Sequence, residues 1–217
     1  MIRFNRVSTS VVDEERDRRV VFDNLTVAVP TRRRVAILGE EPRMATSFLH
    51  LLAGSEIPDS GRVTTKAVRR LSPIVCGGAS LMPQLSGVHN IAFFARVHGV
   101  DSVRLVETVD NICRFGADLN RPVRSLSAAQ RRELEATLVA ALPFDCFLVD
   151  RLHELPGEVR WRIFMAARLR KAGFIFTTSQ PEVAKRFGDC FIILRDAKGR
   201  AFRDPERAIT YLNDGKR

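Results

Sequence analysis

A short stretch near the N-terminus has the position, and some of the residues, of a phosphate-binding loop. Residues 34–38 form an apolar run, RVAIL, which Gly39 follows, and a helical pattern begins at Thr46 and Ser47. A glycine and hydroxyl residues at this spacing, between a strand and a helix, belong to the consensus G-x-x-x-x-G-K-[ST], whose backbone amides and lysine bind phosphates. The lysine and the second glycine are absent, so the chemistry of this loop is in question from the start.

The residues that complete this frame oppose anion binding. Pro42 has no amide hydrogen, Met44 replaces a glycine that lets a phosphate approach the backbone, and Ala45 stands at the lysine position. Glu40 and Glu41 add negative charge beside a helix start that would otherwise favour anions. We therefore expect this loop not to form a wide anion-binding nest.

The elements that must position this loop alternate along the chain. Apolar strand patterns occur at 21–29, 35–39, 144–150, 174–179 and 190–196, with helical patterns at 46–53, 157–171 and 181–187. Strands alternating with helices predict an α/β fold with a mostly parallel sheet wrapped by helices. We place the sheet core at about 1–78 and 144–217, within a single domain of 1–217.

Three consecutive helical patterns interrupt the strands and predict a helical subdomain inserted at about 79–143. The first has Ser86 as its expected N-cap and Gly99 beyond its end. The third begins at Ser127, which with Gln130 forms a predicted capping box, in which each side chain satisfies a free amide of the first turn.

Composition narrows the class of protein. The 217 residues carry a net charge of +10, but the arginines are scattered and there is one Tyr and one Trp, so a nucleic-acid partner is not expected. The four cysteines form no C-x-x-C pair and read as core residues of a reducing compartment, and no metal site is predicted. No stretch approaches the roughly 20 apolar residues of a bilayer span, so the expected protein is soluble or peripheral to a membrane.

Read in order, four segments resemble the nucleotide-binding domain of ABC transporters, which has a P-loop NTPase-type ABC ATPase fold. They are VAILGEEPRMATSFLHLLAGSEIPDSGRV, LSGVHNIAFFARVHGVD, RPVRSLSAAQRRELEATLVAALPFDCFLVD and FIFTTSQPEVAKRFGD. Their order and spacing are most similar to the ATPase subunits of capsular and O-antigen polysaccharide exporters. The resemblance extends from about Val20 to the C-terminus.

This resemblance assigns two sets of residues to nucleotide chemistry. The positions that match the family's own nucleotide site, and that would bind nucleotide weakly, are Gly39, Thr46, Ser47 and Asp150. The positions that match the signature helix, which touches the phosphates held by a second subunit, are Ser127, Ala128, Ala129 and Gln130. The resemblance implies that Asp150 would orient the Mg²⁺ ion of the nucleotide. It also implies that Ser127 would cap its own helix and face a phosphate held by the other subunit.

The same frame marks positions where the chemistry is lost, so the resemblance implies no catalytic residue. The degenerate positions are Pro42, Met44, Ala45, Met82, Arg151, Gly157 and Gln180. Arg151 stands where a glutamate would orient the attacking water, and Gln180 stands at the switch histidine. Losing one group that stabilises the transition state typically lowers the rate by a factor of about 100 to 1,000, so the combined losses predict a pseudo-ATPase.

The leading hypothesis is a structural or regulatory subunit of a polysaccharide-export ABC transporter in a capsule system. It would lie in the cytoplasm at the inner membrane, contact a permease, and form a dimer with an intact ATPase subunit or with itself. No cofactor is expected in its own site, and ATP with Mg²⁺ would bind only weakly or through the partner. One alternative is a weakly active ATPase with a relocated site at Arg43, Gln84 and Glu154, and another is a basic binding protein that reuses the fold.

Overall fold

The computed structural model describes residues 1–12, 18–65, 70–76 and 80–214, and it has the α/β fold expected from the sequence. Its main sheet has six strands in the order β5-β6-β7-β3-β8-β9. Their bounds are β3 Arg34–Gly39, β5 Leu71–Val75, β6 Cys146–Val149, β7 Gly173–Thr177, β8 Cys190–Arg195 and β9 Lys198–Phe202. All neighbours are parallel except β8 and β9, which form an antiparallel hairpin at one edge.

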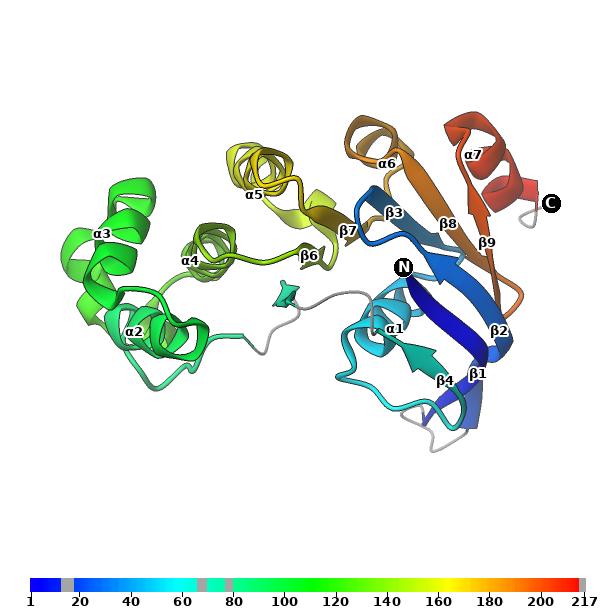
Figure 1. Cartoon of the computed structure of the whole chain (residues 1–217), viewed down its shortest axis with the longest axis horizontal. Coiled ribbons are helices and arrows are strands. Elements are labelled where there is room, and N and C mark those ends of the chain that lie inside the picture. The colour runs from blue at the N-terminus through cyan, green and yellow to red at the C-terminus, as the bar shows by residue number, and fades with distance from the viewer. Residues whose placement is uncertain (13–17, 66–69, 77–79, 215–217) are drawn as a thin grey trace.

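A smaller antiparallel sheet of three strands, in the order β2-β1-β4, lies beside the main one (Figure 1). Its strands are β1 Ile2–Val12, β2 Arg18–Val29 and β4 Ser60–Thr64. Helix α1, Pro42–Ala53, packs in a shared core with residues of both sheets, with Phe48 stacked on Phe4 of β1 at 4.3 Å between ring centroids. This packing places the start of α1 beside the carboxyl ends of the parallel strands.

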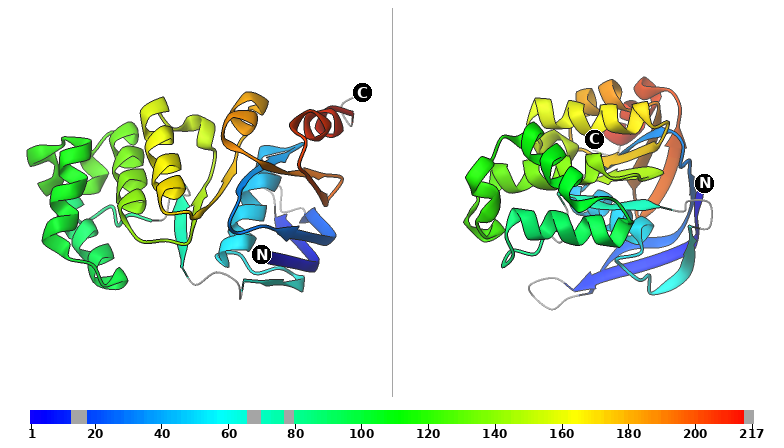
Figure 2. Two further views of the ribbon diagram at one scale, coloured as in Figure 1. Left: turned by 45° about the horizontal axis from the view of Figure 1, so that its top comes forward. Right: turned by 60° about the vertical axis from the view of Figure 1, so that its left-hand side comes forward.

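The remaining helices cover the other face of the main sheet and extend beyond its β5 edge (Figures 1 and 2). They are α2 Gly87–His98, α3 Ser102–Cys113, α4 Ala128–Ala141, α5 Gly157–Leu169, α6 Pro181–Phe187 and α7 Pro205–Asn213. Short 3₁₀ segments occur at η1 Gly116–Asn120, η2 Val123–Ser125 and η3 Leu152–Glu154. None of the helices within the described ranges is long and apolar enough to cross a bilayer.

The parallel strands are buried on both faces, which explains why their sequences are almost continuously apolar. In β8, Cys190, Ile192 and Leu194 face the core that contains α1, whereas Phe191 and Ile193 face the helices on the other side. This alternation along one strand follows from the two-residue period of side-chain direction in β-structure.

Local signals in the sequence placed several elements correctly. Ser86 caps α2 by accepting a hydrogen bond from the His89 amide, and Gly99 ends the helix in the left-handed conformation. The Ser127–Gln130 capping box at the start of α4 is present. These features depend only on residues within one turn of each other, which is why the sequence alone reveals them.

Three elements differ from the expectation. Helix α1 begins at Pro42 rather than at Thr46, because proline, with its fixed φ, is well suited to the first turn of a helix. Strand β1 lies in the polar N-terminal stretch and is stabilised by pairing with β2 and β4. Strand β9 was not predicted, because the sequence AKGR at 197–200 is typical of a turn; only Asp196 and Ala197 form the turn, and residues 198–202 pair with β8.

Candidate functional site

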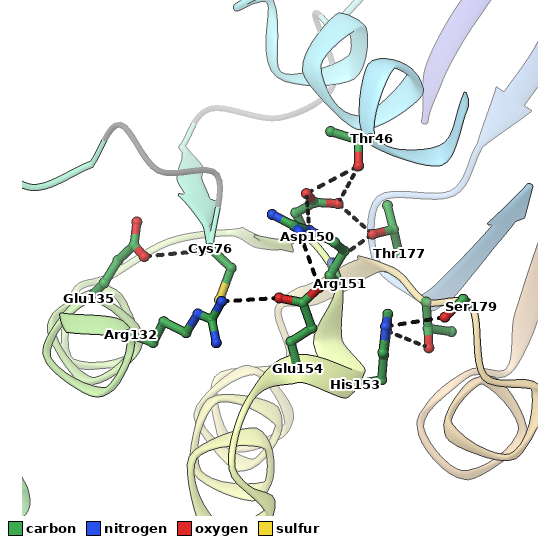
Figure 3. Close-up of polar contacts among 11 residues, drawn as sticks. Thr46, Cys76, Arg132, Glu135, Asp150, Arg151, His153, Glu154, Thr177 and Ser179 are labelled. Carbon is green, nitrogen blue, oxygen red and sulfur yellow. Dashed lines mark hydrogen bonds and ion pairs between the residues drawn. The ribbon is translucent and has the colours of Figure 1, made fainter. Parts of the chain in front are cut away.

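The candidate site lies at the carboxyl edge of the main sheet, around the side chain of Asp150 (Figure 3). Asp150 follows β6 and is 1% exposed. Thr46 of α1 donates its hydroxyl hydrogen to both carboxylate oxygens, at 3.0 and 3.2 Å, and Thr177 of β7 donates to Oδ1 at 2.6 Å. Two of the residues assigned from sequence to nucleotide chemistry, Thr46 and Asp150, are thus brought into direct contact.

Arg151 adds a cation to the Asp150 carboxylate, on the oxygen Oδ2 that Thr46 also contacts. Its Nε donates to Oδ2 of Asp150 at 3.3 Å, and its terminal nitrogen lies 3.1 Å from a Glu154 carboxylate oxygen. The Arg151 backbone has a φ of 47°, in the left-handed region, and its amide donates to the Thr177 hydroxyl at 2.7 Å. Backbone and side chain together hold a cation at the position where the family resemblance would place a catalytic glutamate.

Glu154 is held on its second oxygen as well, by Arg132 of α4 at 3.2 Å. The chain Arg132–Glu154–Arg151–Asp150 is a continuous set of ion pairs that links α4 to the end of β6 (Figure 3). Each oxygen of the Glu154 carboxylate is therefore engaged by a different guanidinium group. Arg132 was not predicted as a member of this cluster.

The loop between β3 and α1 consists of Glu40 and Glu41 alone, because the helix begins at Pro42. The Glu40 amide donates to the Leu194 carbonyl oxygen at 3.0 Å, and its carboxylate accepts the Asp196 amide at 3.0 Å. The Met44 amide donates to the Glu41 carbonyl oxygen at 3.1 Å. Amides that a phosphate loop would direct at its ligand are here bonded to the protein itself.

The mouth of this loop is partly closed from the side of β2. Arg19 forms an ion pair with Glu41, and both lie beside Arg43 and Met44 around a cavity of about 120 Å³. Pockets that hold small molecules typically measure about 300 to 1,000 Å³. A Cβ on Gly39 would lie 2.7 Å from the Glu41 carbonyl oxygen, which shows how tightly the turn is folded against the strand.

The positions of the missing glycine and lysine have become part of the hydrophobic core. Met44 is 6% exposed and Ala45 is 4% exposed, and both pack in the core shared with Phe48. Ser47, assigned from sequence to the nucleotide site, instead donates its hydroxyl hydrogen to the Glu56 carboxylate at 2.9 Å. The Ser47 side chain is thus directed to Glu56 and not to the Asp150 cluster.

The segment that follows β7 contacts the site through the side chain of His153, and not through that of Gln180. His153 Nδ1 lies 3.2 Å from the Thr178 hydroxyl oxygen, and Nε2 lies 3.2 Å from the Ser179 hydroxyl oxygen. Burial lowers the pKa of His153 below its usual value, with the nearby Arg151 acting in the same direction and Glu154 against it. Gln180 is exposed, and its amide donates to the Thr178 hydroxyl at 3.1 Å.

The other degenerate positions lie outside the Asp150 cluster. The Met82 amide and carbonyl oxygen both bond to the Asn90 side chain of α2, at 2.7 and 3.0 Å, and Gln84 is exposed in the turn that follows. Within the described residues, neither Met82 nor Gln84 bonds to Asp150. A Cβ on Gly157 would meet only the end of the Arg160 side chain, at 3.9 Å, so an aspartate there would fit.

A buried carboxylate, Glu135 of α4, connects the helical subdomain to the end of β5. Its Oε2 accepts the Cys76 amide at 3.0 Å, and burial raises the pKa of this carboxyl above its usual value. Burial also raises the pKa of the Cys76 thiol to about 12, so the thiol stays protonated at neutral pH. Glu135 was not recognised from the sequence, although a carboxylate between the apolar residues Leu134 and Ala136 was a usable signal.

The start of α4 is exposed. Ser127 accepts the Gln130 amide at 3.2 Å, and the Gln130 side chain accepts the Ser127 amide at 2.9 Å. Ser127, Ala128 and Ala129 are all exposed to solvent. The positions predicted to meet a phosphate in trans therefore form an open helix start with small side chains.

Comparison with known proteins agrees with this geometry. No protein-family model matches the sequence. Over 200 residues the chain is 23% identical to the ATP-binding protein BexA of Haemophilus influenzae, covering 90% of this chain and 91% of that protein. It is 24% identical over 186 residues to the polysialic acid transport ATP-binding protein KpsT of Escherichia coli, covering 83% and 82% of the two chains.

A third relative is the capsule polysaccharide export ATP-binding protein CtrD of Neisseria meningitidis serogroup B, which is 23% identical over 201 residues. Among solved structures, the ATP-binding cassette MJ0796, a dimer bound to ADP and phosphate after hydrolysis, superposes with a TM-score of 0.78. That match covers 94% of this chain and 98% of the other at 16% identity. The chain thus has the fold of an ABC ATPase cassette and is similar in sequence to ATP-binding proteins of capsule export.

Proposed function

We propose that this chain is a degenerate ATP-binding-cassette subunit of a polysaccharide-export ABC transporter, which does not hydrolyse ATP at its own site. The observation that carries the proposal is the Arg151 guanidinium, 3.3 Å from the buried carboxylate of Asp150. The similarity to BexA, KpsT and CtrD supports the assignment to polysaccharide export.

The loss of hydrolysis follows from what the site can no longer do. Arginine cannot accept a proton from an attacking water, because its guanidinium stays charged in proteins. The Arg151 guanidinium also offsets the negative charge of the Asp150 carboxylate, which would otherwise attract Mg²⁺. The short loop, the bonded Glu40 and Met44 amides and a neighbouring cavity of only about 120 Å³ argue against a triphosphate site in this loop.

The relocated active site considered above is not favoured by these contacts. Both carboxylate oxygens of Glu154 are already engaged, one by Arg132 and the other by Arg151, so neither is left unpaired to orient an attacking water. Gln84 lies in the turn before α2. The next residue, Leu85, accepts the Val123 amide at 2.9 Å, so this turn is bonded to Val123 and not to the Asp150 cluster. Arg43 lies on the surface beside the loop and remains the only group of the three near Gly39.

In this role the chain would lie at the cytoplasmic face of the inner membrane and contact a permease through the helices within residues 79–143. It would pair with an intact ATPase subunit, whose bound ATP would face the open start of α4. The first turn of a helix offers free amides and a favourable dipole to a phosphate, and Ala128 and Ala129 place no bulk in the way. Such a heterodimer would hold at most one ATP.

Nucleotide binding by the purified chain is the first test. Equilibrium dialysis with labelled ATP and Mg²⁺ should detect no saturable site that the Asp150→Asn change weakens, and no phosphate should be released. Ala45→Lys alone should not change this, because Arg151 and Gln180 remain, whereas the triple change with Arg151→Glu and Gln180→His is the smallest that could restore turnover. Low-micromolar ATP binding with turnover by the unmodified chain would refute the proposal.

The purified pair with an intact ATPase subunit tests the contact in trans. Asp and Asn both cap helices well, so Ser127→Asp and Ser127→Asn should preserve α4 equally. Ser127→Asp adds a negative charge facing the partner's ATP and should weaken its binding, whereas the matched Ser127→Asn should not. Two equivalent ATP sites in the pair, or equal affinities for both variants, would contradict this arrangement.

A further inference from the structure

A second cavity, of about 350 Å³, lies at the edge of the main sheet opposite to Asp150, where β3 and β7 begin. Two turns meet there, one before β3 and one between α5 and β7. They are in close contact, since a Cβ on Gly173 would lie 2.2 Å from the Thr31 carbonyl oxygen. The charged residues that line this basic cavity are Arg32, Arg33, Arg34, Arg168, Lys171 and Asp189.

The single carboxylate of the basic cavity is fully engaged by one of its cations. Asp189 Oδ2 accepts Nε of Arg34 at 3.1 Å, and Oδ1 accepts the Arg34 amide at 3.1 Å. The Arg34 carbonyl oxygen in turn accepts the Asp189 amide at 2.9 Å. This pair is therefore part of the fold, and it leaves four cations without a counter-charge among the lining residues.

These four side chains are Arg32, Arg33, Arg168 and Lys171. Across the part of the chain that the structure describes, none of the four makes an ion pair. The cations at the other edge behave differently, since Arg132 and Arg151 both pair with Glu154. A concave wall that carries one sign of charge concentrates the electrostatic field and attracts ions of opposite sign.

The backbone at Lys171 adds a second observation. Helix α5 ends with the Lys171 amide bonded to the Arg168 carbonyl oxygen and the Ala172 amide bonded to the Ala167 carbonyl oxygen. This pattern places Lys171 in the left-handed region, at a φ of 53°, where glycine is usual. A lysine in this conformation costs about 1 kcal/mol relative to glycine, so a cationic side chain stands at the rim where glycine would be more stable.

The shape of the basic cavity favours a small ligand. Its floor contains Phe164 and Phe174, which are 3% and 0% exposed, and its volume lies in the range of about 300 to 1,000 Å³ typical of small-molecule sites. Arginine and lysine side chains that converge on a hollow match a compact anion with several oxygens, and arginine suits phosphate in particular.

We propose that the basic cavity binds a small ligand carrying two or more phosphate groups. This site is separate from the one at Asp150, so it does not depend on the function proposed above. The same phosphate chemistry could be supplied by a soluble compound or by the headgroup of an anionic lipid, and the experiment below separates the two.

Inorganic pyrophosphate is the probe for the soluble source. Equilibrium dialysis of the full chain against labelled pyrophosphate at fixed ionic strength should show one saturable site. Trp161, the only tryptophan in the chain, contacts Phe164 at 5.3 Å between ring centroids, so its fluorescence should change over the same concentration range. The absence of saturable binding to both pyrophosphate and lipid would overturn the proposal.

A charge-matched pair of double variants locates the site. Arg168→Gln with Lys171→Gln should weaken pyrophosphate binding by about tenfold or more, because charge-assisted bonds to phosphate are lost. Arg104→Gln with Arg114→Gln is the control, because both residues are exposed on or beside α3 and Arg114, like Lys171, ends its helix with a positive φ. Equal weakening by the two double variants would indicate non-specific attraction and would overturn the proposal.

Vesicles test the lipid source. Sedimentation with vesicles containing cardiolipin, whose headgroup carries two phosphates, compared with vesicles of phosphatidylcholine alone, measures binding to such headgroups. Pyrophosphate binding without selective sedimentation supports a soluble ligand. Sedimentation that the Arg168→Gln/Lys171→Gln variant loses and the Arg104→Gln/Arg114→Gln variant retains supports a headgroup, and retention by both variants excludes the basic cavity as the lipid site.

Discussion

Helices α1 and α4 begin in opposite ways, although the sequence assigns both starts to phosphate contacts. At α1 the N-cap Glu41 makes no side-chain cap, Pro42 removes an amide, and Arg19 pairs with Glu41 across the opening. At α4 a complete capping box leaves Ser127, Ala128 and Ala129 exposed. The polar groups at the start of α1 are bonded within the protein, whereas the start of α4 is exposed to solvent.

This difference separates two requirements that one sequence must meet. Around α1 the polar groups are bonded internally, and Asp150 is held by Thr46, Thr177 and Arg151. These contacts stabilise the fold without a ligand. Around α4 the cap stabilises its own helix only, so the surface stays available to a partner. A subunit relieved of hydrolysis but still required to dimerise would need this combination.

The largest expected effect concerns the internal bonding around Asp150. Asp150→Ala leaves two threonine hydroxyls and the Arg151 guanidinium without their acceptor, so unfolding free energy should fall by about 2 to 4 kcal/mol. Urea denaturation followed by circular dichroism measures this. Asp145→Ala, at the exposed beginning of the same strand region, should cost about 1 kcal/mol or less. Equal losses would show that the Asp150 cluster contributes little to the fold.

The next effect concerns the cap of α4. Ser127→Ala removes the acceptor of the Gln130 amide and should lower the unfolding free energy by about 1 kcal/mol. Ser127→Asp supplies another acceptor and should keep most of the stability that the cap contributes. The same denaturation experiment applies. No loss in Ser127→Ala would mean that the exposed start of α4 does not depend on its cap.

A smaller effect of opposite sign is expected at the start of α1. Glu41 is too long to cap its own helix, so Glu41→Asp should add a side-chain cap and raise the unfolding free energy by about 0.5 kcal/mol, with the charge unchanged. Glu41→Gln keeps the length and removes the charge, and it should give no gain. A destabilised Glu41→Asp variant would show that the Arg19 ion pair outweighs the missing cap.

The smallest effect is a pH dependence from His153. Because burial lowers its pKa, the unfolded chain binds more protons than the native one just below the usual value of 6.5, and stability should fall as pH drops through that window. Proton NMR should show His153 titrating below 6.5. Arg151→Gln removes a cation that lowers this pKa and should raise it. A His153 that titrates above 6.5 would contradict the packing against Thr178 and Ser179.

Local patterns in the sequence were sufficient for most of the fold. The parallel strands, the caps at Ser86 and Ser127 and the absence of the loop lysine at Ala45 all follow from residues that lie within a few positions of each other. Strands β1 and β9 were not anticipated, because a polar strand is stabilised by pairing with its neighbours and carries a weak pattern of its own.

The sequence by itself determined the order of elements and which chemical groups are missing, since both depend on residue type and short spacing. Only the tertiary structure decided what replaced those groups. Thr46 and Asp150 meet across 104 positions of sequence, and Arg132 reaches Glu154 across 22. The basic cavity likewise joins Arg33 to Lys171. Such contacts depend on side-chain directions set by the packing of whole elements, and no local pattern encodes them.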